Sequence, residues 1–410
     1  MSQTNRKGTN LQSVKWQNRA VVLETLWRYQ PISRKDLAER THLTAATLTN
    51  IVTELLAAGV VEEIGQGEQR LGRRPTMLSF IKDCRYLIGV NLSRTELCIG
   101  LFNMALERQY LLSHPITLEA GEKPVEKFVD LIFQAITNSQ VDAHLIAGIG
   151  ISAPGPLSLK DGVIYSPPNF AEWSNLPLAK IVTQAFNLPV WLDNDANANA
   201  LAEHWLGAGR PYNNFVYVES HSGLGSGIIL NGHLFNGSAG IAAELGHTSI
   251  DRHGPRCACG NYGCVELYSS GPAVVRSVRE AHADGADTIL ADWLGSDLDG
   301  LTFIQVIQAA QQGDSLARQA LYNAACALGL ALVNVINLLD PEAVIIGHQL
   351  HMAGDLCLQP IREIIAQQAF PQTAARFNVL ASELAPPVGI TGAACRALSC
   401  LLQEPTLLER

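Results

Sequence analysis

The chain has few charged residues for its 410-residue length, because Asp, Glu, Lys and Arg together make up only 16% of it. A disordered protein needs much charge and few hydrophobic residues, whereas 47% of this chain is hydrophobic. The composition therefore excludes disorder as the main state. At this length we expect two or three folded domains.

Export and membrane signals are also scarce. The first eight residues are polar and no apolar stretch follows them, so we expect no signal peptide. The most apolar long segment, 315–339, contains Arg318, Gln319 and three asparagines, and we interpret it as a buried helix, not a membrane span. Nine cysteines without a secretory context indicate a reducing compartment. We therefore expect a cytoplasmic protein with no membrane partner.

The charge is unevenly distributed along the chain. Residues 1–80 hold 11 of the 29 basic and 7 of the 38 acidic residues, which leaves 18 basic against 31 acidic residues for the rest. A basic head on an acidic body suggests that the head binds a polyanion. The excess in the head is small, so chance asymmetry is the alternative.

Three helices are predicted before residue 60. Apolar spacing indicates helices over 14–30, over Arg34–Thr41 and from Thr44 to about Ala58. Ser33 and Thr44 suit N-caps, and Gly59 suits the position that ends a helix. Two short helices joined by a tight turn are typical of a helix-turn-helix, which reads DNA in the major groove. A plain three-helix protein-binding module is the alternative.

The second helix of such a motif presents small polar side chains to the bases. Asn can pair with adenine, and the methyl groups of Ala and Thr can contact the thymine methyl. The residues expected to contact DNA from this motif are Ser33, Arg34, Thr44, Ala45, Ala46, Thr47, Thr49 and Asn50.

A basic hairpin follows the helices. Val60–Ile64 and Pro75–Phe80 are predicted strands, and the segment between them is rich in glycine and arginine. This pattern predicts a winged helix-turn-helix over residues 1–80. Arginines on a thin loop can enter a narrow minor groove, so Arg70, Arg73 and Arg74 are expected DNA contacts. A solvated charge run is the alternative.

A cluster of cysteines lies in the second half of the chain. Cys257, Cys259 and Cys264 fall within eight residues, and His247 lies ten residues upstream of the first. Four such ligands suit a structural zinc ion with tetrahedral geometry, whereas the other six cysteines are scattered singly. We predict Zn²⁺ at these four residues; ordinary reduced cysteines are the alternative.

The same stretch carries a family resemblance. Gly246-His247, ten residues and then Cys-x-Cys-Gly-x-x-Gly-Cys-x-Glu resembles the signature of the ROK family, which groups sugar kinases with sugar-responsive repressors. The resemblance covers nearly the whole chain, and Arg73-Arg74-Pro75 is similar to a basic segment of the repressors. It implies an α/β fold, with a two-lobe actin/hexokinase-like (ribonuclease H-like) body behind the winged helix. Lobe 1 would span 81–195, with helix 389–403 packing back on it, and lobe 2 would span 196–388 with the zinc-binding loop 247–264.

The resemblance also implies a sugar site. The matching positions are Asn169, Asn194, Asp195, Glu244, His247 and Glu266. His247 would bind zinc through one ring nitrogen and donate to a sugar hydroxyl through the other. Asp195 matches the base of the kinases but is expected here to bind sugar only. A turn-forming role for Asn169 and a helix N-cap role for Asn194 or Asp195 are the alternatives.

The first phosphate turn departs from the kinase pattern. The kinases carry Asp-x-Gly-Gly-Thr, whereas this chain has Asn91-Leu92-Ser93-Arg94-Thr95. Asn91 removes a charged partner of a divalent metal, and Ser93 and Arg94 prevent close approach of the backbone to phosphate. His348 and Gln349 are likewise bulkier than the kinase turn beside adenosine, and the glycine-rich segment 222–227 is weak support for nucleotide binding alone. We therefore expect no enzyme activity.

These features predict a sugar-responsive transcriptional regulator. We expect a repressor that is released from operator DNA by a monosaccharide in the interlobe cleft and that works as a homodimer or tetramer. Two alternatives stay open. One is a ROK sugar kinase with a DNA-binding head, and the other is a repressor controlled by a sugar-transport protein partner.

Overall fold

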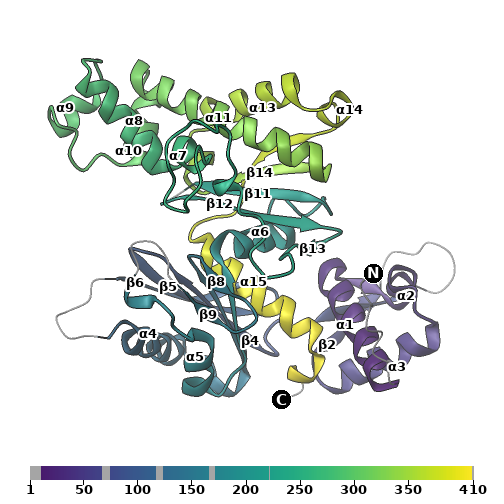
Figure 1. Ribbon diagram of the computed structural model, residues 1–410. Coiled ribbons are helices and arrows are strands. Elements are labelled where there is room, and N and C mark those ends of the chain that lie inside the picture. Colours follow the sequence, from purple (N-terminus) through teal and green to yellow (C-terminus); the bar gives the residue numbers. More distant parts are fainter. Residues whose placement is uncertain (1–10, 67–73, 117–122, 166–170, 221, 409–410) are drawn as a thin grey trace, which may run out of the picture. The chain divides into compact units, whose positions relative to one another are not determined.

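The computed structural model describes residues 11–66, 74–116, 123–165, 171–220 and 222–408. The chain forms two compact units, shown in Figure 1. Unit 1 contains residues 1–194 and 389–410, and unit 2 contains residues 195–388. The division falls after Asn194, one residue before the boundary expected from the sequence, and the N-terminal head belongs to the same unit as the sheet that follows it.

The head has the order of a winged helix. Its elements are α1 (Leu11–Tyr29), β1 (Ile32–Ser33), α2 (Arg34–Thr41), α3 (Ala45–Ala57), β2 (Val61–Gln66) and β3 (Thr76–Phe80). The three strands form one sheet in the order β1-β3-β2. The Ser33 hydroxyl accepts from the Asp36 N–H, the Thr44 hydroxyl accepts from the Thr47 N–H, and Gly59 has φ +67°. Local capping therefore sets the helix ends where the sequence predicts them.

The head joins the next sheet through a short hydrogen-bonded connection. Only residues 81–85 separate β3 from β4 (Tyr86–Leu92). The Met104 N–H donates to the Lys82 carbonyl over 2.8 Å, and the Trp27 indole N–H donates to the Met104 carbonyl over 2.6 Å. Trp27 lies on α1 and is 9% exposed. The head is therefore packed against the rest of unit 1 and is not held by a free linker.

The sheet of unit 1 has the order β10-β7-β4-β5-β6. Its other strands are β5 (Glu96–Asn103), β6 (Arg108–Pro115), β7 (Ile146–Ala153) and β10 (Val190–Asn194). Helices α4 (Pro124–Ser139), α5 (Leu178–Phe186) and α15 (Val388–Gln403) belong to the same unit, with the short β8 (Leu157–Ser158), β9 (Val163–Ile164), η1 (Ala143–Leu145) and η2 (Ala171–Trp173) between them. A Cβ atom at Gly89 or Gly150 would overlap the Ile390 or Ala393 carbonyl oxygen, so glycine lets α15 lie directly on β4 and β7.

Unit 2 repeats this strand arrangement. Its sheet has the order β13-β12-β11-β14-β15, built from β11 (Phe215–Ser220), β12 (Leu224–Leu230), β13 (His233–Leu234), β14 (Ala343–Gly347) and β15 (Asn378–Ala381). In both sheets three successive antiparallel strands are followed by two parallel strands beside the first of them. The two units are thus two copies of one topology.

The helices of unit 2 supply most of its core. They are α6 (Asp195–Leu206), α7 (Glu266–Ser269), α8 (Gly271–Ala283), α9 (Leu290–Leu294), α10 (Phe303–Gln311), α11 (Ser315–Leu339), α12 (His348–Met352), α13 (Asp355–Gln368) and α14 (Pro371–Ala374). By length and composition α11 could cross a membrane, but half of its most apolar window is buried inside the unit. This agrees with its interpretation as a buried core helix.

Candidate functional sites

The four predicted metal ligands of unit 2 come together. His247 ends the short helix η3 (Leu245–His247), and the three cysteines follow in one loop. Their ligand atoms all lie within 4.8 Å of one another. The Cys257 sulfur is 3.8 Å from His247 Nδ1, and the Cys259 and Cys264 sulfurs are 3.7 Å apart. His247 therefore turns Nδ1 to the cluster, which leaves Nε2 for another partner.

Backbone geometry folds this loop. Isolated bridges pair Ser249 with Cys264 and Arg256 with Tyr262, and the Cys257 N–H donates to the Asn261 carbonyl over 2.8 Å. Gly263 has φ +62°, and a Cβ atom there would overlap the Asp251 carbonyl oxygen. Only glycine satisfies both conditions, so Gly263 is required for the approach of the two loop strands.

The donor set fits a cation. Burial and the neighbouring sulfurs of Cys259 and Cys257 raise the pKa of the Cys264 thiol to about 12. Three thiolates this close repel one another, and a bound divalent ion would remove that penalty. One imidazole and three thiols around one point could therefore hold a metal ion.

Two carboxylates flank the cluster. Burial raises the pKa of Glu244, with the Glu266 carboxylate adding to this effect and His247 opposing it, so the three groups are close enough to interact. Glu266 begins α7, and its Oε2 accepts from the Leu224 N–H over 3.0 Å. A Cβ atom at Gly223 would lie 2.6 Å from this oxygen. The glycine-rich segment 222–227 is therefore largely strand and not a turn, since β12 begins at Leu224, and its start is bonded to a carboxylate of the protein itself.

Asp195 begins α6, and its Oδ1 accepts from the Ala196 N–H over 2.9 Å. One turn later, Asn199 donates to the buried Glu219 carboxylate over 2.7 Å, and the Tyr217 hydroxyl donates to the same oxygen over 2.9 Å. Burial raises the pKa of Glu219, with the two hydrogen bonds opposing it. This network fixes the first turns of α6 and with them the backbone of Asp195.

Asn194 is the last residue of β10 in unit 1. Its N–H donates to the Asp193 carboxylate over 2.8 Å, and its side-chain nitrogen lies 3.3 Å from the position of a Cβ atom on Gly155. Asn169 lies outside the described residues. Of the six predicted sugar residues, unit 2 brings Glu244, His247 and Glu266 together around the metal loop.

The 91–95 turn of unit 1 is closed by its own side chains. The Ser93 hydroxyl accepts from the Thr95 and Glu96 N–H groups over 3.3 and 3.0 Å. The Asn91 amide oxygen lies 2.8 Å from the Ser152 hydroxyl, which is also 3.2 Å from the Gly389 carbonyl oxygen. Two N–H groups that an open turn would offer to phosphate are thus already satisfied.

Most of the predicted DNA contacts at the start of α3 are exposed to solvent. Thr44, Ala45, Ala46, Thr49 and Asn50 are exposed, and Thr47 is half-buried. Other predicted contacts are arranged differently. Ser33 is 3% exposed and its hydroxyl is bound to Asp36, so it positions α2 and offers no free hydroxyl to DNA.

The remaining predicted contacts are arginines. Arg34 donates to the Glu63 carboxylate over 3.1 Å and remains exposed. Arg74 is exposed at the start of the strand region, and Arg70 and Arg73 lie outside the described residues.

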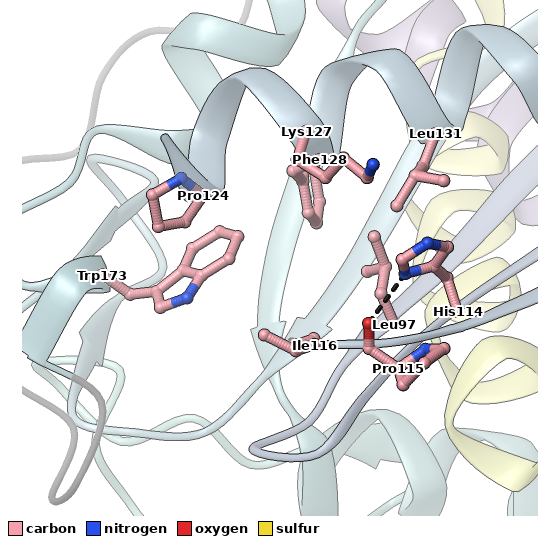
Figure 2. Close-up of a pocket in the computed structure, with 9 residues that line it drawn as sticks. All are labelled: Leu97, His114, Pro115, Ile116, Pro124, Lys127, Phe128, Leu131 and Trp173. Carbon is pink, nitrogen blue, oxygen red and sulfur yellow. Dashed lines mark hydrogen bonds between the residues drawn. The ribbon is translucent and has the colours of Figure 1, made fainter. Parts of the chain in front are cut away.

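A separate pocket in unit 1 is apolar. Figure 2 shows Trp173 and Phe128 on its walls, with Leu97, Ile116 and Leu131. The two aromatic rings meet edge to face at 5.6 Å, and His114 Nδ1 is 2.7 Å from the Pro115 carbonyl oxygen. These walls offer few hydrogen-bonding groups to sugar hydroxyls, whereas the side chains around His247 are polar.

A winged helix fused to a doubled five-stranded α/β body with a His-Cys₃ loop defines a DNA-binding protein class built on a sugar-kinase-like scaffold. Residues 87–399 match the ROK family, and residues 17–63 match the MarR family. The chain belongs to the ROK family, as its cysteine motif indicated, and the expected fold class is confirmed.

Both branches of the family occur among the relatives. The chain is 34% identical to a xylose repressor of Caldicellulosiruptor bescii, over 95% of this chain and 97% of the relative. It is 32% identical to a glucokinase of Thermotoga maritima, over 75% of this chain and 96% of the relative. A solved ROK family transcriptional regulator, described as a homolog of the Escherichia coli MLC protein, superposes with a TM-score of 0.84 at 28% identity, over 97% of this chain and all of that one. The glucokinase match thus covers a smaller share of this chain than the two repressor-type matches.

Proposed function

We propose that this protein is a DNA-binding transcriptional repressor that a monosaccharide releases from its operator. The observation that carries the proposal is the junction of a winged-helix head with a complete ROK body in one chain. The similarity to a xylose repressor over 95% of the chain supports it. A homodimer would present two heads to a palindromic operator, as helix-turn-helix proteins commonly do.

The sugar site of this proposal consists of Asn169, Asn194, Asp195, Glu244, His247 and Glu266. Carboxylates, amides and an imidazole suit the hydroxyl groups of a sugar, because they donate and accept in fixed directions. Nδ1 of His247 would bind the metal, and Nε2 would carry the proton and donate to a sugar hydroxyl. Zinc at His247, Cys257, Cys259 and Cys264 would supply no chemistry beyond holding this loop in shape.

The arrangement of the 91–95 turn favours a protein without kinase activity. The Ser93 hydroxyl accepts hydrogen bonds from two N–H groups of the turn. The Ser152 hydroxyl donates to the Asn91 amide oxygen and to the Gly389 carbonyl oxygen. The second candidate is nevertheless a sugar kinase with a DNA-binding head, because Asp195 matches the kinase base and a glucokinase is 32% identical. Incubation with Mg-ATP and a sugar panel distinguishes the two, and sugar-dependent turnover would overturn the non-enzymatic proposal.

The first test is thermal unfolding of the full-length protein with D-xylose, D-glucose and N-acetylglucosamine, each with and without Mg-ATP. A ligand at a hundred times its Kd adds about 2.7 kcal/mol of stability. We expect a shift with a free sugar and none from Mg-ATP. The Asp195→Ala variant should lose the shift, whereas Asp292→Ala on α9 should keep it.

The second test is operator release. Operator duplexes are selected from a random pool with the protein itself, and the active sugar is then added. We expect operator affinity to fall when the sugar binds. No thermal shift with any sugar, together with release by a sugar-transport protein, would replace the sugar effector by a protein effector.

A further inference from the structure

We propose that Asp193 and Arg396 act as positioning residues that couple sugar binding at Asn194 to the DNA-binding head through α15. This inference rests on the proposed sugar-responsive function. Asp193 and Arg396 are 203 positions apart in the sequence, and neither is among the six sugar residues.

The coupling begins at a buried ion pair. Asp193 is fully buried, and its Oδ2 lies 3.0 Å from Nε of Arg396. Its other oxygen accepts from the Asn194 N–H over 2.8 Å. One carboxylate thus holds the backbone of a proposed sugar ligand and a side chain of α15. A sugar that displaces Asn194 must also disturb the contact with α15.

The start of α15 is tied to the same strands. The Ser152 hydroxyl lies 3.2 Å from the Gly389 carbonyl oxygen, and Ser152 is the register partner of Asp193 between β7 and β10. Gly389 is also where the chain re-enters unit 1, and Asn194 is where the chain leaves it. Ser152 therefore contacts the first turn of α15, and Asp193 contacts α15 about two turns further along.

The far end of α15 reaches the head. After Gln403 the chain forms η4 (Pro405–Leu407), which contacts α1, and Leu408 beyond it is 1% exposed. The 16 residues of α15 correspond to about 24 Å of helix. Figure 1 shows this helix, in yellow, passing from β4 to the neighbourhood of α1. The head itself is held to unit 1 by the bond from Trp27 to the Met104 carbonyl and has only residues 81–85 as its connection.

The ion pair determines the relative position of β10 and α15 in a way that apolar packing alone would not. Replacing a buried ion pair by apolar residues of similar volume is often neutral or stabilising, so stability does not require a charge at position 193. The charged pair instead sets the distance between β10 and α15 at this point. Because α15 rests on Gly89 and Gly150 without intervening side chains, a change at Arg396 moves the helix as a whole.

The test uses the double variant Asp193→Asn/Arg396→Met of the full-length protein. Both charges are removed together, and the new amide oxygen can still accept from the Asn194 N–H. The measured quantity is the ratio of operator affinities without and with the sugar that shifts the wild type, chosen from D-xylose, D-glucose and N-acetylglucosamine. Allosteric ratios of about 5 to 150-fold are typical.

We expect the double variant to keep its thermal shift with sugar and its operator affinity without sugar, each within about threefold of the wild type. Its affinity ratio should fall to near one, and operator DNA should no longer weaken sugar binding, because coupling is reciprocal. The exposed pair of Arg362 and Asp355, 3.1 Å apart in unit 2, provides the control Asp355→Asn/Arg362→Met, which should keep the wild-type ratio.

A wild-type ratio in a folded Asp193→Asn/Arg396→Met protein would overturn the inference. Should that variant fail to fold, Leu407→Ala tests the other end of the path, because Leu407 lies in η4, which contacts α1. Full coupling in Leu407→Ala would then overturn the inference, and reduced coupling with unchanged sugar affinity would support it. A wild type that binds none of the sugars would refute the proposed function itself, which is a separate outcome.

Discussion

Gly263→Ala should destabilise unit 2 far more than the same change three residues earlier at Gly260. Both glycines lie in the metal loop with positive φ, +62° and +97°. An alanine in the left-handed region costs about 1–2 kcal/mol, partly offset by about 0.4–1 kcal/mol from the stiffer unfolded chain. This backbone cost, about 1 kcal/mol net, applies to both positions.

The two glycines differ in the space that is available for a side chain. Nothing lies within 4 Å of a Cβ atom at Gly260, whereas one at Gly263 would overlap the Asp251 carbonyl oxygen. Relief of that overlap breaks the bonds from the Gly263 N–H to Pro255 and from the Ile250 N–H to Gly263, both 2.9 Å long. Two lost hydrogen bonds add about 2 kcal/mol, so Gly263→Ala should cost at least about 3 kcal/mol in total.

The assay is thermal unfolding with metal content measured in parallel. For a unit of this size, 1 kcal/mol corresponds to about 2–4 °C in Tm. We expect a loss of about 6–12 °C and reduced bound metal for Gly263→Ala, against about 2–4 °C and normal metal for Gly260→Ala. Equal losses in the two variants would refute the argument that close approach, and not φ alone, requires glycine at 263.

Three further predictions concern the metal, pH and DNA. Cys264→Ser should lower the zinc content of freshly purified protein and the Tm of unit 2, and a metal-free wild type would contradict the proposed zinc site. Glu219 has a raised pKa, so unit 2 should lose stability as pH rises from the unfolded value of about 4.3 through the folded value, and Glu219→Gln should flatten that slope in Tm measured between pH 4 and 8. Arg74→Ala should weaken operator binding and lower the slope of log affinity against log salt by about one; an unchanged slope would mean that Arg74 contacts no phosphate.

The features that could be predicted from the sequence are those that short segments determine. Ser33 and Thr44 cap helices with their own hydroxyls, so their residue types are informative without the rest of the fold. The metal ligands span only 18 residues, and their spacing already limits how they can meet.

Other features depend on contacts between distant segments. The Asp193–Arg396 pair joins residues whose proximity follows from the placement of α15 on the sheet, which no local pattern encodes. Local sequence patterns likewise do not predict helices α4, α5 and α13 or strands β6 and β15. The closure of the 91–95 turn by Ser93 was also not predictable, because a serine there could equally have pointed outward.

The closed turn between β4 and β5 also has an evolutionary consequence. Recovering an open turn would require a carboxylate at position 91 and glycines at positions 93 and 94. The first change places a charge beside Ser152 and Gly389, and the second removes the hydroxyl that satisfies two N–H groups. Each substitution alone would lose stability before any phosphate could bind. A phosphate-binding turn at this place would therefore require several simultaneous changes, because each single change is unfavourable by itself.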